Sequence, residues 1–272
     1  MISGQISEEN YFDANRKSWD ARTAIHEKSK FYDLEGFLGG KNLLNSIKLE
    51  ALGDVQGKSL LHLQCHFGLD SLCWSRLGAK VTGVDFSEKA ITIARDVNVR
   101  ASLDARFICA NIYDLRDHLS ETFDIVFTSY GVIGWLPDLD RWASIVSRYL
   151  KPGGTFYMAE FHQVVWMFDD EFTRIDYSYF NKDVITTEQN GTYTDRDAVI
   201  SSTEYGWNHS IAEVFGSLHS HGLEILAIEE FDYSPYNCFL NMVSDGKSGY
   251  YIKGFEGKLP MVYSVKAVKG EG

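Results

Sequence analysis

Two histidines and a cysteine lie close together in LLHLQCHFGLD, the stretch from residue 60 to residue 70. His62, Cys65 and His66 have side chains that bind metal ions, and a spacing of four residues can place two ligands on one face of a helix. However, His62 stands in an apolar run typical of a strand, where successive side chains point to opposite faces. The glutamate of an HExxH motif and a second cluster of His and Cys are also absent nearby. We therefore predict no metal site here.

The same stretch has the layout of a nucleotide-binding turn, in which a strand ends in a short loop and a helix follows. The next strand ends in VTGVD, so Asp85 can accept hydrogen bonds from both hydroxyls of a ribose. Only Gly68 remains of a GxGxxG pattern, because Gln64 and His66 stand where glycine is usual. A pyrophosphate needs a close approach of the backbone, so we expect the loop to disfavour NAD and FAD. S-adenosylmethionine, which has no phosphates, would tolerate these side chains.

The elements that must position this loop alternate in the pattern of a parallel sheet. Apolar runs typical of strands occur at 59–63, 80–85, 105–110, 123–129 and 155–161, and again in LEILAIEEF and PMVYSVKAV. Helical spacing follows the first two runs and recurs at 138–150 and at about 208–221, and Ser87 is placed to cap the second helix. The sequence predicts an α/β, doubly wound, Rossmann-like and mostly parallel seven-stranded sheet, with helices on both faces and the last strand antiparallel.

We expect four segments along the chain. Residues 1–55 form a helical lid, 56–161 the core, 162–206 an inserted cap over the substrate site, and 207–272 the C-terminal part of the same sheet. In the cap, Asn190 and Gly191 stand between two alternating runs, which predicts a type I′ hairpin. The aromatic side chains of the cap favour an enclosed, largely apolar pocket for a small organic molecule.

The charge balance of the chain limits its partners. Among 272 residues, 38 are acidic and 26 are Lys or Arg, so the formal net charge is -12 and no nucleic-acid partner is expected. The N-terminus has no signal-peptide pattern and no apolar stretch approaches the ~20 residues of a membrane helix. We therefore expect no membrane insertion and a cytoplasmic location. The four cysteines form no CxxC pair, which favours reduced thiols.

Five stretches in order resemble the motifs of class I SAM-dependent methyltransferases: LLHLQCHFG, VTGVDFS, ARFICANIYDL, FDIVFTSYGVIGWLPDLDRW and LKPGGTFYMAEFH. The likeness covers roughly residues 55 to 235. The chain is similar in particular to the small-molecule branch that includes the ubiquinone and menaquinone biosynthesis enzymes. Within that branch it resembles a subgroup with a variant HLQCHFG first motif. The resemblance implies S-adenosylmethionine as cofactor, S-adenosylhomocysteine as product, and a small organic methyl acceptor.

The resemblance also implies roles for individual residues. The cofactor site would comprise Gln64, Cys65, His66 and Gly68 on the methionine side, Asp85 at the ribose, Phe86, Asn111 and Ile112 at the adenine, and Ser129 at the methionine tail. The family usually has an acid where His62 stands, so the methionine ammonium is expected to be held by Gln64 or by backbone carbonyls. Arg22 is a candidate partner for the cofactor carboxylate if the N-terminal segment closes as a lid.

Methyl transfer from a sulfonium needs mainly proximity and alignment, and a base only if the acceptor must lose a proton. The candidates for such a catalytic group are Tyr130, His162 and His209, together with Glu160 and His26. Two other functions stay open: a nucleotide-dependent oxidoreductase, and a non-catalytic protein that binds S-adenosylmethionine or S-adenosylhomocysteine on the same fold. The sequence predicts neither the identity of the acceptor nor an oligomeric state.

Overall fold

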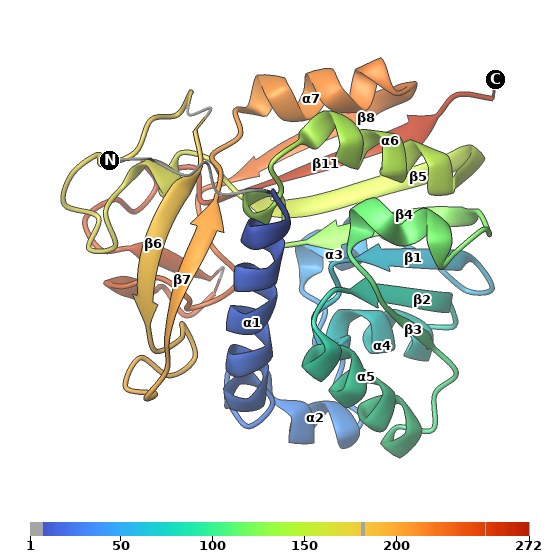
Figure 1. The fold of residues 1–272 in the computed structure, drawn as a ribbon, viewed down its shortest axis with the longest axis horizontal. Helices are drawn as coiled ribbons and strands as arrows, with labels where there is room; N and C mark the ends of the chain where they lie inside the picture. Colours follow the sequence, from blue (N-terminus) through green and yellow to red (C-terminus); the bar gives the residue numbers. More distant parts are fainter. Residues whose placement is uncertain (1–7, 181–182, 248, 272) are drawn as a thin grey trace.

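The computed structural model describes residues 8–180, 183–247 and 249–271, and its centre is one seven-stranded sheet (Figure 1). The strand order is β3 (Arg106–Cys109), β2 (Lys80–Asp85), β1 (Ser59–Leu63), β4 (Phe123–Ser129), β5 (Leu150–Phe161), β11 (Val262–Lys269) and β8 (Leu223–Phe231). The first five strands in this order, β3, β2, β1, β4 and β5, pair in parallel. β11 is antiparallel to both of its neighbours, β5 and β8. The predicted fold class, including the antiparallel last strand, is confirmed.

Most strands begin and end where the apolar runs do. A parallel strand that is covered on both faces needs a continuous apolar sequence, and such runs stand out from the polar turns between them. β1, β2, β4 and β8 have the predicted bounds, while β5 begins earlier than predicted, at Leu150. Part of β5 before Thr155 is exposed, which is why this part lacks an apolar pattern.

Helices cover both faces of the sheet. Buried side chains of α2 (Leu34–Leu38), α3 (Ser46–Leu52), α4 (Leu69–Arg76) and α5 (Glu88–Arg100) belong to the core on one face. Those of α6 (Leu139–Tyr149) and α7 (Ile211–Ser220) belong to the core on the other. As predicted, Ser87 caps α5, because its Oγ accepts a hydrogen bond from the N–H of Ala90 at 3.0 Å. Short 3₁₀ helices lie at Ile112–Asp117, Ile133–Trp135 and Val165–Met167.

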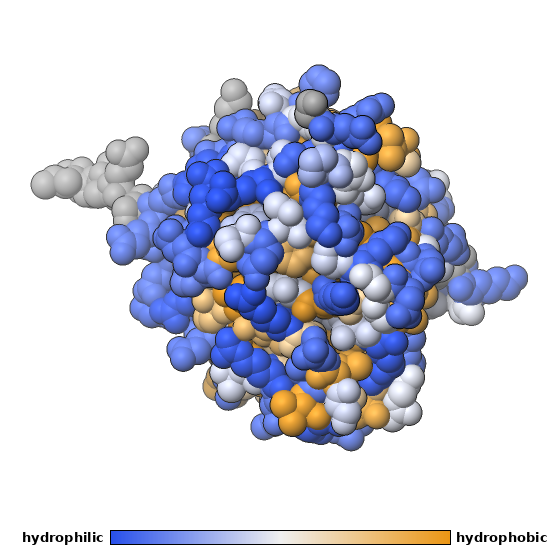
Figure 2. Space-filling view, turned by 90° about the vertical axis from the view of Figure 1, so that its right-hand side faces the viewer, coloured by the Kyte–Doolittle hydropathy of each residue, from blue (hydrophilic) through white to orange (hydrophobic). Residues whose placement is uncertain are grey.

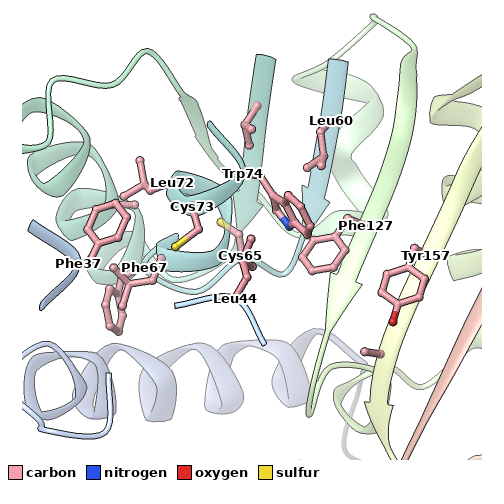
Figure 3. Close-up of a cluster of buried hydrophobic side chains, with 14 of the residues drawn as sticks. Phe37, Leu44, Leu60, Cys65, Phe67, Leu72, Cys73, Trp74, Phe127 and Tyr157 are labelled. Atoms are coloured by element: carbon pink, nitrogen blue, oxygen red, sulfur yellow. The ribbon is translucent and has the colours of Figure 1, made fainter. Parts of the chain in front are cut away.

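The core on the α4 side is built from large aromatic rings (Figure 3). Trp74 of α4 meets the ring of Phe127 edge-on at 5.9 Å between centroids, and Phe127 stacks with Tyr157 at 6.3 Å. Leu60 of β1 is buried on this face, whereas its neighbour Leu61 is buried on the other, as the alternation of a strand requires. This packing fixes β1, β4 and the start of α4, which are the elements that carry the first loop.

Helix α1 (Glu8–His26) lies across the carboxyl ends of the strands, between the sheet and a hairpin of β6 (Ile185–Asn190) and β7 (Ser201–Gly206) (Figure 1). Asn15 of α1 donates a hydrogen bond to the carbonyl of Tyr205 at 2.7 Å and accepts one from its N–H at 2.9 Å. On the other side, Ser87 donates to Asp20 at 2.6 Å. Helix α1 therefore joins the hairpin to the core.

The predicted type I′ turn at Asn190 and Gly191 is wrong, although the hairpin itself exists. A type I′ turn needs positive φ at both central residues, and Asn190 is the last residue of β6, with no positive φ. Gly191 has φ 70° and donates to the carbonyl of Ile200 at 3.0 Å, so residues 191–200 form a longer connection. Further along, β9 (Met242–Ser244) and β10 (Tyr250–Ile252) pair as a small antiparallel ribbon.

The face at the amino ends of the strands lies on the side of the sheet away from α1 (Figure 1). Figure 2 shows mainly hydrophilic residues there, with hydrophobic residues scattered between them. Within the described ranges, no helix combines the length and the apolar character that crossing a bilayer requires. Residues 1–7 of the expected lid lie outside the described residues, and the division into lid, core and cap stays a prediction.

Candidate functional site

A cavity of about 720 Å³ opens at the carboxyl ends of β1 and β4. These two strands are neighbours in the sheet, and the chain winds outward from them in opposite directions, toward β3 on one side and β5 on the other. Ligands of open α/β sheets bind in the crevice at such a switch point. Side chains from α1, from the hairpin and from residues 165–172 and 236–240 complete the walls.

The loop after β1 keeps the backbone of a glycine loop although two of its residues are not glycine. Gln64 and His66 have φ of 56° and 52°, and Gly68 has φ 79°. The left-handed conformation costs a residue with a side chain about 1 kcal/mol or more, so other contacts must offset it. Gln64 donates from Nε2 to the carbonyl of Val132 at 3.0 Å, and the ring of His66 is within hydrogen-bond distance of Thr23 Oγ1 at 3.2 Å.

Gly68 is the position where no side chain fits. A Cβ atom there would lie 2.6 Å from the ring of Phe107 and 3.2 Å from Cβ of Ala94. Gly68 also stands at the start of α4, whose first turn follows directly. The one glycine that remains in the loop is therefore required both by its φ and by the close approach of α5 and β3.

Asp85 ends β2 beside this loop, and it is almost fully buried at the cavity wall. Its Oδ2 accepts from the N–H of His66 at 2.8 Å, and its Oδ1 accepts from the N–H of Ser87 at 2.9 Å. Burial raises the pKa of Asp85 to about 6, although both hydrogen bonds lower it. Each carboxylate oxygen can accept a second hydrogen bond, so the group can also receive two hydroxyls.

The other residues proposed for the site line the same cavity: Arg22, Cys65, Phe86, Asn111, Ile112, Ser129 and Tyr130. The side chain of Asn111 caps a 3₁₀ turn, because its Oδ1 accepts from the N–H of Tyr113 at 3.1 Å. Arg22 is buried and forms an ion pair with Glu204 of β7. Its Nε has no hydrogen-bond partner among the described residues. Which part of the cofactor each of these residues binds stays a prediction.

A polar network at the base of the cavity was missed by the sequence analysis. Asp70 of α4 accepts from Lys48 Nζ at 2.6 Å and from Ser129 Oγ at 3.1 Å, both at Oδ2. Lys48 is fully buried and also donates to the hydroxyl of Tyr236 at 3.0 Å. Asp70 could have been noticed as a charged residue in the first turn after the loop. Lys48 and Tyr236 gave no local signal, because only the fold brings them together.

Three of the proposed acid–base residues have their polar atoms engaged. Glu160 accepts hydrogen bonds from the backbone N–H groups of Gly131, Val132, Ile133 and Phe161. His162 bonds to Glu230 at 2.9 Å and His209 to the carbonyl of Leu136 at 2.8 Å, and neither histidine lines the cavity. Only Tyr130 and Glu160 of the candidates therefore lie at the cavity wall, and Glu160 holds the loop after β4.

Rings from α1 and the following segment surround His66. The ring centroids of Trp19, His26 and Tyr32 lie 5.3, 5.2 and 5.4 Å from that of His66. Burial lowers the pKa of His66, and burial with the nearby charge of Arg22 lowers that of His26 to about 3. Both imidazoles are therefore neutral near neutral pH. Neither ring nitrogen of His26 has a hydrogen-bond partner among the described residues.

Residues 61–158 match the family model of a methyltransferase domain. The ubiquinone biosynthesis O-methyltransferase of Xanthomonas oryzae pv. oryzae is 27% identical over 134 residues, which are 48% of this chain and 56% of that protein. Its counterpart from Coxiella burnetii is 29% identical over 143 residues, which are 49% of this chain and 60% of that protein. The chain thus matches little more than half the length of these curated relatives.

Solved structures with the same fold cover more of the chain. A putative S-adenosylmethionine dependent methyltransferase from Listeria monocytogenes has a TM-score of 0.57 at 20% identity, over 82% of this chain and 95% of that one. A DhpI-SAH complex structure has a TM-score of 0.58 at 15% identity, over 98% and 100%. Residues 61–158 thus resemble a methyltransferase domain, and the chain has the Rossmann-like fold of these solved structures.

Proposed function

We propose that this chain is an S-adenosylmethionine-dependent methyltransferase that methylates a small organic acceptor. We further propose that it belongs to the small-molecule branch, in a subgroup with the variant HLQCHFG first motif. The observation that carries this proposal is the pairing of Asp85 with the loop after β1 in one crevice. The loop keeps left-handed backbone at Gln64 and His66, and Asp85 is bound to the backbone of that loop at His66.

The lining of the cavity fits the parts of the cofactor. Asp85 would bind the ribose, with Phe86, Asn111 and Ile112 at the adenine. Gln64, Cys65, His66, Gly68 and Ser129 would face the methionine and sulfonium side. Oε1 of Gln64 supports this placement, because it is buried without a hydrogen-bond partner among the described residues and lies in a cavity-lining side chain. A buried amide oxygen of this kind is normally paired, and where the protein supplies no donor, a ligand or a water supplies it.

The replacement of two glycines also bears on the choice of cofactor. Side chains at positions 64 and 66 would obstruct a pyrophosphate, which requires the backbone itself to approach. A cofactor without phosphates does not need that approach. The neutral state of His66 further means that a cationic sulfonium would meet no positive charge on this imidazole of the wall.

The acceptor would bind beneath the cap, beside Tyr130. The wall on this side is mainly aromatic and includes Phe161, Trp166, Phe172, Trp207, Tyr236 and Phe239. Such a wall favours a small, largely apolar molecule that is enclosed from water. The cap at 162–206 and the lid at 1–55 would then select and enclose it. The rate enhancement would come mainly from alignment of the acceptor with the sulfonium methyl group.

Tyr130 is the catalytic candidate that the geometry favours. It follows β4 directly, lines the cavity and accepts a hydrogen bond from Asn45 Nδ2 at 3.1 Å. Burial raises its pKa well above the usual value, so the phenol stays protonated near neutral pH and can donate a hydrogen bond to the acceptor. Tyr130 would therefore orient the acceptor rather than remove a proton from it.

Calorimetry with S-adenosylmethionine, S-adenosylhomocysteine and NADH tests the proposal. We expect the first two to bind to the folded protein and NADH not to bind. Absence of binding by both adenosyl ligands would contradict the proposal. Binding of NADH alone would favour an oxidoreductase. Binding of S-adenosylhomocysteine without methyl transfer to any member of a metabolite extract would favour a non-catalytic binding protein.

A further inference from the structure

We infer that Asp70 forms a site for a primary ammonium group at the base of the cavity, and that its ligand is the ammonium of the cofactor's methionine part. The inference rests on the proposed function, and it assigns this role to a residue outside the motif positions considered above. It also explains how the chain can lack an acid at position 62.

The two carboxylate oxygens of Asp70 differ in their hydrogen bonds. Both hydrogen bonds to this carboxylate, from Lys48 Nζ and from Ser129 Oγ, reach Oδ2. In the part of the chain that the structure describes, none reaches Oδ1. Asp70 lines the cavity and its side chain is 20% exposed, which leaves Oδ1 as the oxygen for a donor from a ligand. A fixed carboxylate with one open oxygen is suited to a charged donor.

Lys48 orients this carboxylate. Its side chain is fully buried, and although burial lowers its pKa, the neighbouring Asp70 and Tyr236 raise it above the usual value. The ammonium of Lys48 also lies 5.4 and 5.7 Å from the ring centroids of Tyr130 and Tyr236. The hydrogen bond from Lys48 therefore fixes the orientation of the Asp70 carboxylate through Oδ2.

His62 cannot serve as the acid that the resemblance leads one to expect. Burial lowers the pKa of His62 to about 4, and its Nδ1 is within hydrogen-bond distance of Ser71 Oγ at 2.8 Å. It is therefore neutral near neutral pH. Two cavity-lining side chains, Asp70 at Oδ1 and Gln64 at Oε1, instead carry an acceptor oxygen without a hydrogen-bond partner among the described residues. Two acceptor oxygens, one of them charged, match a protonated amine and disfavour a carboxylate or phosphate.

The test compares S-adenosylhomocysteine with its deaminated analogue, 5′-S-(3-carboxypropyl)-5′-thioadenosine, by calorimetry. We expect the natural protein to bind S-adenosylhomocysteine roughly tenfold or more tightly than the analogue, as is typical of a charge-assisted hydrogen bond. Asp70→Asn should remove most of this preference. Asp33→Asn is a matched control, because Asp33 also lines the cavity and pairs with Lys41, and it should keep the preference.

A second variant guards against a loss of folding when Lys48 loses its partner. Asp70→Asn with Lys48→Met removes both charges together, and this variant should fold and should also lack the preference. If the natural protein binds neither ligand, the proposed function and this inference both fail. If it binds S-adenosylhomocysteine but does not discriminate against the analogue, or if both Asp70 variants keep the preference, the inference alone is overturned.

Discussion

Gln64 donates a hydrogen bond of 3.0 Å to the carbonyl of Val132, and this bond joins the loop after β1 to the loop after β4. The two loops lie on the two sides of the switch point of the sheet. The side chain that replaces a glycine therefore helps to set the separation of the two loops at the crevice. Its own Oε1 is buried without a hydrogen-bond partner among the described residues.

Replacement of Gln64 by Ala should weaken both the fold and the binding of S-adenosylhomocysteine. One buried hydrogen bond is lost, which lowers the free energy of unfolding by about 1 kcal/mol. Denaturant unfolding and calorimetry measure the two effects, with affinity expected to fall several-fold. Gln56→Ala, at an exposed position, is the control and should change neither value. Unchanged affinity in Gln64→Ala would remove this residue from the proposed cofactor site.

Cofactor affinity should depend on pH through Asp85. Burial raises the pKa of Asp85 to about 6, so below that pH the group is largely protonated and accepts fewer hydrogen bonds. Binding of S-adenosylhomocysteine should therefore weaken as the pH falls from neutrality through about 6. Calorimetry across this range checks it. Asp85→Asn should bind weakly and lose the dependence, and a dependence that persists in this variant would assign it to another group.

The same shift has an opposite effect on the stability of the protein without cofactor. The pKa of Asp85 is raised above its usual 3.8, so the folded chain keeps this proton to a higher pH than the unfolded chain does. This contribution to stability is present below about 4 and is lost as the pH rises to about 6. The free energy of unfolding of the natural protein, minus that of Asp85→Asn, should fall over this interval. A constant difference would contradict the shift.

Glu160 should behave as a positioning residue. Its carboxylate accepts four backbone N–H groups around the turn that carries Tyr130. Glu160→Gln places an amide N–H₂ against some of these donors, which should lower the free energy of unfolding by about 2 kcal/mol. Denaturant unfolding measures this loss. Glu230→Gln, which changes an exposed partner of His162, should have little effect. A similar result for both variants would contradict the role of Glu160.

Because Arg22 and Glu204 form an ion pair, the loss of stability on replacing Arg22 should depend strongly on whether Glu204 keeps its charge. Both side chains are buried, so Arg22→Met leaves an uncompensated charge and should cost about 3 kcal/mol of stability. Arg22→Met with Glu204→Gln removes both charges and should recover much of the loss. A double-mutant cycle of unfolding free energies measures the coupling. S-adenosylhomocysteine affinity that is equal in all variants would reject Arg22 as a partner of the cofactor carboxylate.

The sheet could be predicted because its strands are buried on both faces and so form continuous apolar runs. The loop between β6 and β7 could not, because a turn signal at Asn190 and Gly191 does not show where pairing resumes. Pairing resumes at Ser201, opposite Asn190. In the site, Asp85 and the first loop could be placed from motif order. Asp70 and Lys48 could not be connected, because their contact depends on the packing of α3 against the sheet.

The position of β11 inside the sheet has a consequence for the order of folding. β8 has a single neighbour in the sheet, and that neighbour is β11, which comes later in the chain. During synthesis, β8 therefore has no partner strand until the ribosome has released the residues of Val262–Lys269. The nascent chain can assemble β1 to β5 beforehand, but it carries an unpaired strand until that moment. Chaperones that shield exposed strand edges would be expected to act in this interval.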